Sequence, residues 1–518
     1  MATFLLGVDA GTSVIKSIVF DLDGREVAGA SRETELLHPA PAWVEQDMHA
    51  VWQAVAETVC EAVAGAIEKT GCRPDEIAAV GVTGQGDGTW LVDEDGRPVR
   101  NAILWLDGRS GEMVREAHAG GLSEEVFAIT GTALNTSNQA LHLRWLEAHE
   151  PHALERASAA LRAKDWVYLK LTGIVSTDES DASHTYFSTH ERAYSDRLIE
   201  LLGLNHLRRL LPPALPASAN VAPLLPQAAA ALGLAPDMPV VSGPFDVAAA
   251  DLGAGVVEPG DACTILGTAG INQMVIAEPV AEPFNAGYTM CHAPAGRLVR
   301  LLPTMAGALN LQWFVEQCFA HEAQTAAAEH RDFWAWCESQ AQTIPIGSQG
   351  VMYHPYIDTA GERSPFVRTD ARAQFTGVSV NHTRATLLRA VYEGVVLSAM
   401  DCYEHLGGAV RSLKLAGGGA RSPFWAQMYA DALGCEVDVV EGSEQGARGA
   451  AMNAGVAVGL YAGYEEAVAR CIRSARSYAP HPQRTASYRS LLPLYRHSYE
   501  AMFPVWEERK RWLEEGHS

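Results

Sequence analysis

Two short Gly-Thr turns lie about half the chain apart and have the composition of anion-binding loops. The first, Val8-Asp9-Ala10-Gly11-Thr12-Ser13, ends an apolar run, and Ile265-Leu266-Gly267-Thr268-Ala269-Gly270 ends another. Each turn is predicted to join two strands, the second strands covering residues 15–21 and 271–276. Such a turn lets the backbone approach an anion and offers N–H groups and a hydroxyl as donors. The pair could hold a polyphosphate from two sides and indicates two related domains.

Two acidic residues stand where strands are expected to end. Asp9 ends the first predicted strand, where a carboxylate can hold Mg²⁺ through its water shell, and Lys16 could neutralise phosphate charge. Asp246 follows the apolar segment 239–245 and opens a helix of small residues. A carboxylate there can accept the proton of an attacking hydroxyl, or it can serve only as a helix N-cap. By itself, the first Gly-Thr turn is equally compatible with an ordinary β-hairpin.

Further loops carry groups suited to a purine and to a polyol. Ala416-Gly417-Gly418-Gly419-Ala420-Arg421-Ser422 follows a predicted strand and precedes a helix, and three glycines let the backbone lie flat against a purine. The segments 83–88 and 105–109 contain amide, carboxylate and aromatic side chains, which are the groups that bind polyols. A solvated acid in a turn is the alternative interpretation of Asp107.

These loops require a regular scaffold, which the hydrophobic pattern supplies. Predicted strands cover residues 4–9, 14–21, 26–30, 77–82 and 239–245, and predicted helices cover 47–69, 139–173 and 384–405. The helix 47–69 has valines at i, i+4 spacing and Asp47 as its N-cap. A segment rich in Gly and Ala at 251–258 is interpreted as a hinge. The predicted domains are therefore residues 1–252 and 253–518.

Composition excludes several classes of protein. A chain of 518 residues is too long for one ordinary core. Its 39 basic and 62 acidic residues give a net charge of −23, which opposes nucleic-acid binding. The nine cysteines form no C-x-x-C pair, which is typical of a reduced, cytoplasmic protein. The N-terminus lacks the features of a signal peptide, and no apolar run approaches the length of a membrane span.

In their order along the chain, these motifs resemble those of the FGGY carbohydrate kinases, a family of the actin, sugar-kinase and heat-shock-ATPase superfold. The resemblance covers nearly the whole chain. It implies two actin-like (ribonuclease H-like) α/β domains with a cleft between them. The N-terminal domain, 1–252, would bind sugar and phosphate and supply the catalytic base, and the C-terminal domain, 253–518, would bind the nucleotide. The implied cofactors are ATP and Mg²⁺.

The resemblance also assigns a role to individual residues. Asp246 corresponds to the general base and Asp9 to the residue that organises the metal. The residues implied to bind nucleotide and phosphates are Gly11, Thr12, Ser13, Lys16, Gly267, Thr268, Gly307, Gly418, Gly419 and Ser422. Those implied to bind the sugar are Gln85, Gly86, Asp87, Trp105, Asp107 and Asp246.

The acceptor loop departs from the common patterns of the family. Xylulokinases typically have Met-His after the glutamine and glycerol kinases have Arg-Glu, whereas this chain has Gly86-Asp87. The string Gly-Gln-Gly-Asp-Gly-Thr-Trp at 84–90 looks most like erythritol kinases. We therefore expect phosphorylation of a small polyol or ketose, with erythritol first and a ketopentose such as xylulose second. A non-catalytic, nucleotide-dependent sugar sensor is the alternative from another class. No nucleic-acid or membrane partner is expected, and a homodimer is usual in the family.

Overall fold

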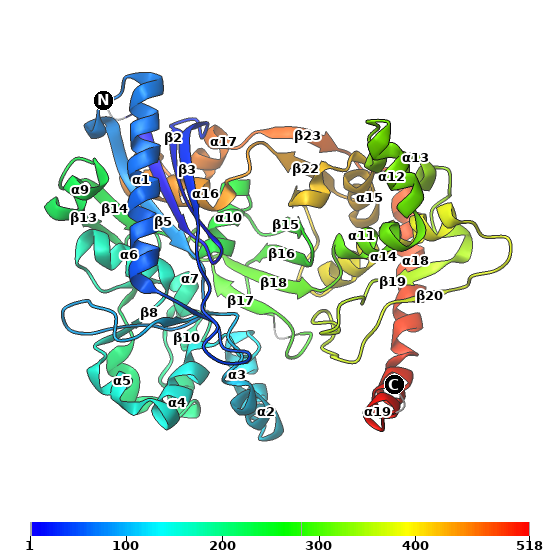
Figure 1. Cartoon of the computed structure of the whole chain (residues 1–518), viewed down its shortest axis with the longest axis horizontal. Helices are drawn as coiled ribbons and strands as arrows, with labels where there is room; N and C mark the ends of the chain where they lie inside the picture. Colours follow the sequence, from blue (N-terminus) through cyan, green and yellow to red (C-terminus); the bar gives the residue numbers. More distant parts are fainter. Residues whose placement is uncertain (1–2, 281, 517–518) are drawn as a thin grey trace. The chain divides into compact units, whose positions relative to one another are not determined.

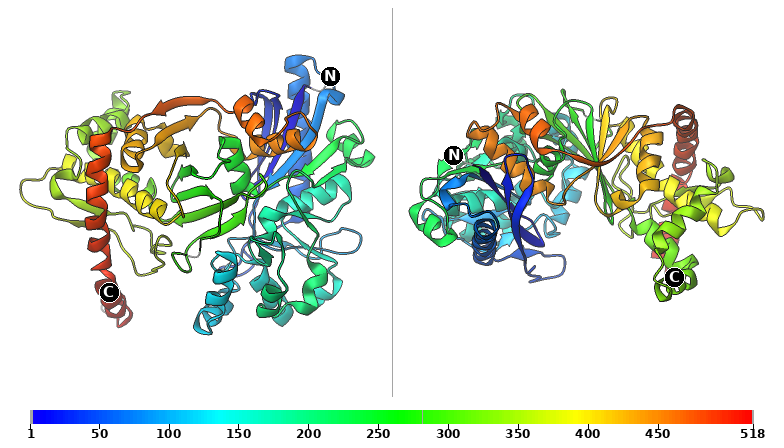
Figure 2. Two further views of the ribbon diagram at one scale, coloured as in Figure 1. Left: turned by 180° about the vertical axis from the view of Figure 1, so that it is seen from behind. Right: turned by 90° about the horizontal axis from the view of Figure 1, so that it is seen from above.

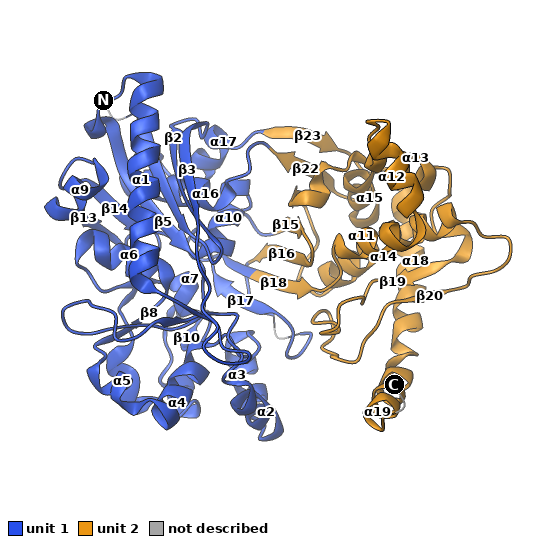
Figure 3. Cartoon of the chain, in the orientation of Figure 1, with its two compact units in different colours: residues 1–259, 277–299, 441–473 blue, residues 260–276, 300–440, 474–518 orange. Residues whose placement is uncertain are grey.

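The computed structural model describes residues 3–280 and 282–516, which form two compact units (Figures 1 and 3). Unit 1 contains the chain up to residue 259 together with residues 277–299 and 441–473. Unit 2 contains residues 260–276, 300–440 and the chain from residue 474 onward. Both units are discontinuous, which no single boundary in the sequence anticipates. The predicted division at residue 252 stays a prediction.

Unit 1 is built on a sheet whose central strands are parallel. Its order is β13-β14-β5-β1-β2-β3, with bounds Val221–Pro223, Pro239–Ser242, Ile77–Gly84, Phe4–Ala10, Val14–Asp21 and Glu26–Glu33. Strand β1 pairs antiparallel with β2 and parallel with β5, and β5 pairs parallel with β14. The register places Asp9 opposite Thr83 and Ser242 opposite Val82. The segments that follow β1, β5 and β14 therefore begin at one edge of the sheet.

Helix α1 (Met48–Thr70) confirms the predicted helix 47–69. Its N-cap Asp47 accepts from the backbone N–H of His49 at 2.7 Å, and it ends at Gly71, whose φ of 72° suits a glycine C-cap. Its length and mean hydropathy of 1.2 would also fit a membrane span, alone among the helices of the described residues. The buried valine stripe packs on β2 and β3, so the core of unit 1 accounts for this apolar character.

Helix α16 (Gln445–Ala457) packs against the sheet of unit 1 and against α10 (Asp246–Ala254). In Figures 1 and 2 the orange segment lies beside the blue strands. Glycines permit this close approach. A Cβ on Gly7 or Gly81 would stand 2.0 Å from a carbonyl oxygen of α16, and a Cβ on Gly449 would stand 1.8 Å from that of Ala249. The close packing of α16 therefore requires glycine, which has no side chain, at these three positions.

The rest of unit 1 forms smaller pairs of strands and a second hydrophobic core. Its further strands are β4 (Glu45–Gln46), β6 (Trp90–Val92), β7 (Ala102–Ile103), β8 (Ala159–Leu161), β9 (Thr177–Asp178), β10 (Phe187–Ser188), β11 (Ala193–Tyr194), β12 (Ala214–Leu215) and β17 (Tyr288–Cys291). Its further helices are α2 (Gly111–Ala119), α3 (Leu122–Thr130), α4 (Gln139–His149), α5 (Pro151–Arg156), α6 (Ala163–Thr172), α7 (Glu179–Ala182), α8 (Asp196–Leu201), α9 (Pro226–Leu232), α17 (Tyr464–Cys471), η1 (Pro74–Glu76) and η2 (Asn205–Leu210).

The prediction of one helix over 139–173 is wrong in its middle. Helices α4, α5 and α6 cover this stretch, and strand β8 separates the last two. Pro151 begins a new helix at its first position, where the missing N–H costs nothing. Strand β8 pairs with β6, so tertiary pairing determines the conformation of residues 159–161. The predicted end is correct, since Gly173 caps α6 with a φ of 74°.

Unit 2 repeats the plan of a hairpin beside parallel strands. Six strands of a seven-stranded sheet follow the order β18-β16-β15-β21-β22-β23, with bounds Leu298–Thr304, Gly270–Ile276, Asp261–Leu266, Ser412–Ala416, Glu436–Val440 and Ser474–Tyr478. Strand β15 pairs antiparallel with β16 and parallel with β21, as β1 pairs with β2 and β5. The predicted recurrence of two related strand–turn–strand units is therefore confirmed.

Helix α14 (Arg384–Glu404) is buried along nearly its whole length in unit 2, which confirms the predicted helix 384–405. The side chain of Thr383 caps its N-terminus. The remaining elements of the unit are α11 (Leu309–Cys318), α12 (Ala320–Ala328), α13 (Phe333–Gln342), α15 (Pro423–Leu433), α18 (Pro482–Glu500), α19 (Phe503–Glu514), η3 (Ser348–Gly350), η4 (Gly418–Arg421), β19 (Met352–His354) and β20 (Gln374–Thr376).

Candidate active site

Asp9 lies at the end of β1, beside the first turn of α16. A Cβ on Gly446 would stand 2.5 Å from its Oδ2. Its Oδ1 is buried and has no hydrogen-bond partner among the described residues. Loss of hydration raises the pKa of Asp9 to about 6, against the opposing charge of Lys16. The Lys16 ammonium lies 2.8 Å from the carboxylate of Glu444. Asp9 thus presents an unpartnered carboxylate oxygen, the kind of ligand that Mg²⁺ prefers.

The predicted phosphate turn after β1 is fixed by its backbone. The Thr12 carbonyl accepts from the Thr34 hydroxyl at 2.5 Å, and the Ser13 carbonyl accepts from the Thr34 N–H at 2.9 Å. A Cβ on Gly11 would stand 2.7 Å from the Val14 carbonyl oxygen, so the turn needs a glycine here. Ser13 itself is exposed. The carbonyl groups of Thr12 and Ser13 therefore help to hold the shape of the turn.

Asp246 is the first residue of α10, directly after the strand β14 and its following loop. Its Oδ1 accepts from the Val247 N–H at 2.6 Å, while the Phe245 N–H donates to the Ser180 hydroxyl at 2.9 Å. Burial raises the pKa of Asp246 well above the ordinary value, and the negative charge of Asp9 adds to this effect. The arrangement holds a carboxylate of high proton affinity at the sheet edge that also carries Asp9.

Thr12, Gln85 and Gln46 form a closed ring of hydrogen bonds, and Trp105 donates into it from a later loop. The Trp105 indole donates to the Thr12 hydroxyl at 2.9 Å, which donates to Gln85 Oε1 at 3.0 Å. Gln85 Nε2 donates to Gln46 Oε1 at 3.0 Å, and Gln46 Nε2 donates to the Thr12 carbonyl at 3.2 Å. Trp105 is 42% exposed, whereas Gln85 is buried. The ring ties the predicted phosphate turn to the predicted sugar loops.

Asp87 is buried and has a backbone φ of 55°, an unusual value for a residue with a side chain. Its Oδ2 accepts from the Ser137 hydroxyl at 2.8 Å, and its Oδ1 lies 3.3 Å from His184 Nδ1. Although burial opposes its charge, His184 and the Ser137 hydroxyl lower the pKa of Asp87. The preceding Gly86 has no side chain, and a Cβ there would stand 2.3 Å from the ring of Phe245.

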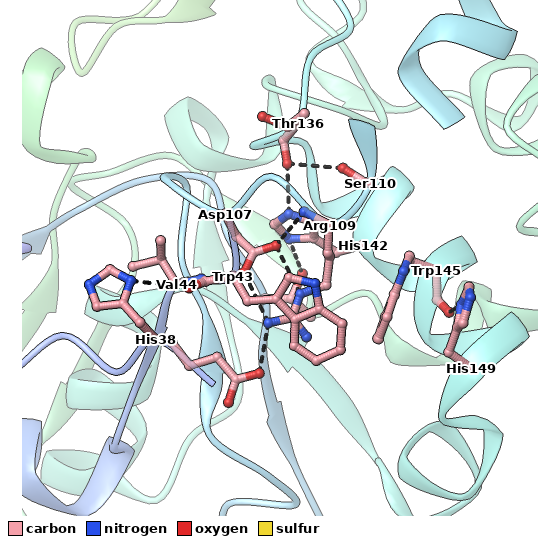
Figure 4. A network of polar contacts seen from close by, with 12 residues as sticks. His38, Trp43, Val44, Asp107, Arg109, Ser110, Thr136, His142, Trp145 and His149 are labelled. Carbon is pink, nitrogen blue, oxygen red and sulfur yellow. Dashed lines mark hydrogen bonds and ion pairs between the residues drawn. The ribbon is translucent and has the colours of Figure 1, made fainter. Parts of the chain in front are cut away.

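Asp107 lies inside the protein, in a network around Arg109 (Figure 4). Its Oδ2 accepts from the Val44 N–H at 2.6 Å, and its Oδ1 accepts from both the N–H and the Nε of Arg109 at 2.8 Å. The guanidinium lies over the Trp43 ring, 4.2 Å from its centroid. Both oxygens of Asp107 are therefore used within the protein. In this structure the residue fixes the loop that carries Trp105, and a sugar contact remains only a prediction.

A buried lysine holds the carboxylates behind Asp246 together. Lys164 Nζ lies 2.7 Å from Asp165, 3.0 Å from Asp178 and 3.2 Å from Asp181. Although burial disfavours its charge, these carboxylates raise the pKa of Lys164. Asp178 also caps α7 through the N–H of Ser180. Asp178, which matches a family stretch in the sequence, thus has a structural role in this arrangement.

In unit 2, the predicted second phosphate turn lies between β15 and β16 and contacts the segment before α11. The Gly267 carbonyl accepts from the Ala308 N–H at 2.8 Å, and the Thr268 carbonyl accepts from the Leu309 N–H at 3.3 Å. A Cβ on Gly307 would stand 2.3 Å from the Thr268 carbonyl oxygen. The fold thus brings Gly307 directly beside the turn, as two residues of one nucleotide site must be.

The predicted adenosine loop begins at the end of β21, the strand beside β15. Gly417 has a φ of 82°, and a Cβ there would stand 2.7 Å from the Leu266 carbonyl oxygen. A Cβ on Gly419 would meet the Leu266 side chain at 2.4 Å, whereas Gly418 faces open space. The Ser422 hydroxyl caps α15 by accepting a backbone N–H at 2.9 Å. Packing explains two glycines, and Gly418 is the position open to a ligand.

Several residues at these sites do not follow from the sequence pattern. Gln46, Glu444, Ser137 and His184 lie far along the chain from the residues they contact. For Glu444, the close spacing of Gly446 and Gly449 at the start of a helix is a usable signal, because small residues mark close packing. The other three carry no signal in one sequence, because only the fold brings them to the sheet edge.

Comparison with known proteins shows the family of this chain. The N-terminal domain of the FGGY family of carbohydrate kinases matches residues 4–253, and the C-terminal domain of the same family matches residues 262–458. Erythritol kinase of Brucella abortus (strain 2308) is 35% identical over 516 residues, covering 97% of both chains. Xylulose kinase of Escherichia coli (strain K12) is 31% identical over 507 residues, covering 96% of this chain and 99% of the relative.

Solved structures share the fold over the whole length. The xylulose kinase from Rhodospirillum rubrum has a TM-score of 0.86 at 28% identity and covers 97% of this chain, with 100% of its own chain matched. Plasmodium falciparum glycerol kinase with ADP has a TM-score of 0.83 at 19% identity, covering 96% and 98% of the two chains, which shows the fold alone. The predicted pair of actin-like α/β domains is thereby confirmed. The chain belongs to the FGGY family of carbohydrate kinases and is a sugar kinase.

Proposed function

We propose that this kinase transfers the γ-phosphate of Mg·ATP to a terminal hydroxyl of a small sugar alcohol, with erythritol as the acceptor. The observation that carries the proposal is the shared sheet edge of unit 1, where the register of β1, β5 and β14 places Asp9, the loop after Gly84 and the loop before Asp246. The similarity to Brucella erythritol kinase supports the choice of acceptor, as does Gly86-Asp87 in place of the Met-His typical of xylulokinases.

Asp246 is proposed to accept the proton of the attacking hydroxyl as the oxygen–phosphorus bond forms. Its raised pKa makes it a strong base once it is ionised, and the hydrogen bond from Val247 fixes its orientation. The loop at 85–88 and Trp105 would hold the polyol, with the indole ring against its C–H face. Placement of this kind can contribute on the order of 7–11 kcal/mol to catalysis.

The nucleotide is proposed to contact both Gly-Thr turns. Gly11, Thr12, Ser13 and Lys16 would hold phosphates from unit 1, and Gly267 and Thr268 from unit 2. Gly307, Gly418, Gly419 and Ser422 would border the nucleoside.

Mg²⁺, when bound with the nucleotide, neutralises charge on the phosphate oxygens. The donors present fit this ion, because Asp9 Oδ1 is a buried carboxylate oxygen without a protein partner. No cluster of three or more His, Cys, Asp or Glu side chains suited to a metal occurs in the described residues. That matches an ion bound through one carboxylate, water and phosphate oxygens. We also expect a cytoplasmic enzyme, active as a homodimer.

A coupled assay of ADP release tests the proposal with erythritol, glycerol, xylulose, ribulose and the pentitols. We expect the highest kcat/KM with erythritol and no turnover after the divalent cation is removed with a chelator. The Asp246→Asn variant should lose about 10²–10⁴-fold in kcat and keep its affinity for ATP. Near-normal turnover by this variant would exclude Asp246 as the base. ATP hydrolysis that no acceptor stimulates would contradict the whole proposal.

The strongest alternative is a ketopentose kinase. Probable L-xylulose kinase of Pasteurella multocida is 30% identical over 463 residues, covering 87% of this chain and 90% of the relative. The same assay decides the matter, since a ketopentose kinase would turn over xylulose or ribulose faster than any polyol.

A further inference from the structure

His184 is a buried histidine, and neither of its ring nitrogens has a hydrogen-bond partner among the described residues. It follows the short helix α7 and is 4% exposed. Its Nδ1 lies 3.3 Å from Asp87 Oδ1. Its Nε2 is buried and has no hydrogen-bond partner among the described residues. A buried polar atom without a partner costs free energy, so such an atom beside a candidate substrate loop points to a ligand.

Aromatic rings hold the His184 imidazole in place. The Phe245 ring packs against it edge to face with 4.6 Å between centroids, and the Tyr288 ring lies 5.8 Å away. The Tyr288 hydroxyl accepts from Asn135 Nδ2 at 2.8 Å. The imidazole is therefore oriented on several sides without any bond to Nε2.

Asp87 and His184 lie close to Asp246, the proposed base. Phe245, which contacts His184, immediately precedes Asp246, and the charge of Asp87 contributes to the raised pKa of Asp246. The ring of Phe245 also occupies the space that a side chain at position 86 would fill. His184, Asp87 and the proposed base thus belong to one neighbourhood of unit 1.

We propose that the Asp87–His184 pair recognises a hydroxyl of the acceptor through His184 Nε2, and that it makes the enzyme prefer a sugar alcohol to a ketose. The inference rests on the proposed function and deepens it. An ionised carboxylate only accepts hydrogen bonds, so the Nδ1 that faces Asp87 carries the proton. With a single proton, on Nδ1, an imidazole presents Nε2 as an acceptor. A hydroxyl can donate to Nε2, whereas the oxygen of a ketone cannot.

This difference in donors is large enough to decide specificity. A site built to pair with a substrate hydroxyl strongly rejects an analogue that lacks it, because buried polar groups then stay unpaired. The same argument assigns Asp87 a positioning role toward His184. Its constrained backbone, with a φ of 55°, is the kind of local strain that persists at ligand sites.

The test compares erythritol with a ketopentose, L-xylulose, in three variants. His184→Phe keeps an aromatic ring between Phe245 and Tyr288 and removes both nitrogens. We expect its kcat/KM for erythritol to fall at least about tenfold, mainly through KM, and that for L-xylulose to change by less than about threefold. His184→Gln, whose amide can reach the position of Nε2, should restore part of the loss. Asp87→Asn should shift the ratio in the same direction as His184→Phe.

His142→Gln is the matched control. His142 is also buried in unit 1, but its Nδ1 pairs with the Thr89 hydroxyl at 3.1 Å and its Nε2 with the Thr136 carbonyl at 2.7 Å. This control should leave the ratio of kcat/KM for erythritol to kcat/KM for L-xylulose unchanged. The KM for ATP and the melting temperature, measured for every variant, separate recognition from loss of folding.

The outcomes distinguish this inference from the proposed function. An unchanged acceptor ratio in folded His184→Phe overturns the inference and leaves the kinase proposal intact. A wild-type enzyme that prefers another polyol to erythritol corrects the acceptor, and the inference is then judged on that polyol and its ketose. A wild-type enzyme that prefers ketoses overturns the inference, and one that phosphorylates no acceptor overturns both.

Discussion

The Asp246 carboxyl group has an environment that resists its ionisation. Burial and the charge of Asp9 raise its pKa well above the usual value of 3.8. A general base acts only in its deprotonated form, so activity must fall as the pH drops through this raised pKa. We predict that the acidic limb of the kcat/KM profile lies well above the range of an ordinary carboxyl group. A profile measured between about pH 5 and 9 that stays flat down to pH 5 would contradict this.

The packing around Gly86 leads to a prediction about the acceptor loop, residues 85–88. A Cβ at this position would stand 2.3 Å from the ring of Phe245, which is itself buried. Overpacking of this kind costs about 1–3 kcal/mol, and the displaced ring adjoins both His184 and Asp246. Gly86→Ala should therefore lower kcat/KM for the acceptor about tenfold or more while the KM for ATP stays unchanged.

Gly408→Ala provides the control, because the nearest atom to its Cβ would lie at 3.6 Å, an ordinary contact. Steady-state kinetics with both substrates measure the effect. If Gly86→Ala and the wild type have equal kcat/KM for the acceptor, the Phe245 ring can move aside without affecting catalysis.

Helix α16 packs closely on the backbone of α10. The Cβ of an alanine at Gly449 would stand 1.8 Å from the Ala249 carbonyl oxygen, which belongs to the backbone of α10 and cannot rotate away. We predict that this clash with α10 makes Gly449→Ala destabilise unit 1 by about 3 kcal/mol, the upper end of overpacking costs, despite the better helix propensity of alanine.

Gly111→Ala in α2 is the matched helix variant, since its Cβ would meet atoms only at 3.9 Å. Urea denaturation of the two variants and the wild type gives the comparison. If Gly449→Ala is as stable as Gly111→Ala, the close packing of α16 on α10 is disproved.

The sequence predicted the elements whose signals are local. Helix α1 has a cap and a valine stripe within its own residues, and α14 has the same kind of apolar periodicity. The break between α5 and α6 depends on β8 pairing with β6, which no local pattern encodes. The positions of Asp9 and Asp246 followed from strand ends, whereas His184 and Gln46 reach the site only through the fold. Asp107 is predicted from the sequence to bind the sugar or to be a solvated acid in a turn, but in the structure it is buried and accepts a hydrogen bond from Arg109.

Across the whole molecule, Glu362 gives stability an unusual pH dependence. It is buried, and its Oε1 accepts from the N–H groups of Met305 at 2.9 Å and Arg363 at 2.7 Å. Burial raises its pKa to about 7. The folded state then holds a proton that the unfolded state releases above the ordinary glutamate pKa of 4.5. Stability should therefore fall as the pH rises from about 4.5 to 7, by on the order of 3 kcal/mol from this group.

Glu362→Gln tests this without disturbing the acceptor oxygen, because an amide carbonyl can keep both backbone hydrogen bonds. The variant should lose this part of the pH dependence and be more stable than the wild type at about pH 8. Chemical denaturation at a series of pH values measures the difference. Parallel curves for the two proteins would mean that folding leaves the pKa of Glu362 unchanged.

The discontinuity of unit 1 determines when the nascent chain can complete its fold. Gly7 and Gly81 leave the ribosome early, yet residues 441–473, which carry the helix that covers them, follow only after residues 260–440. At ordinary rates of translation the bare face of the sheet waits for on the order of 10–40 s. Unit 2 in turn needs α18 and α19 at the end of the chain. Both units thus include residues beyond 440, and a chain cut at residue 440 leaves two unfinished domains for chaperones and proteases.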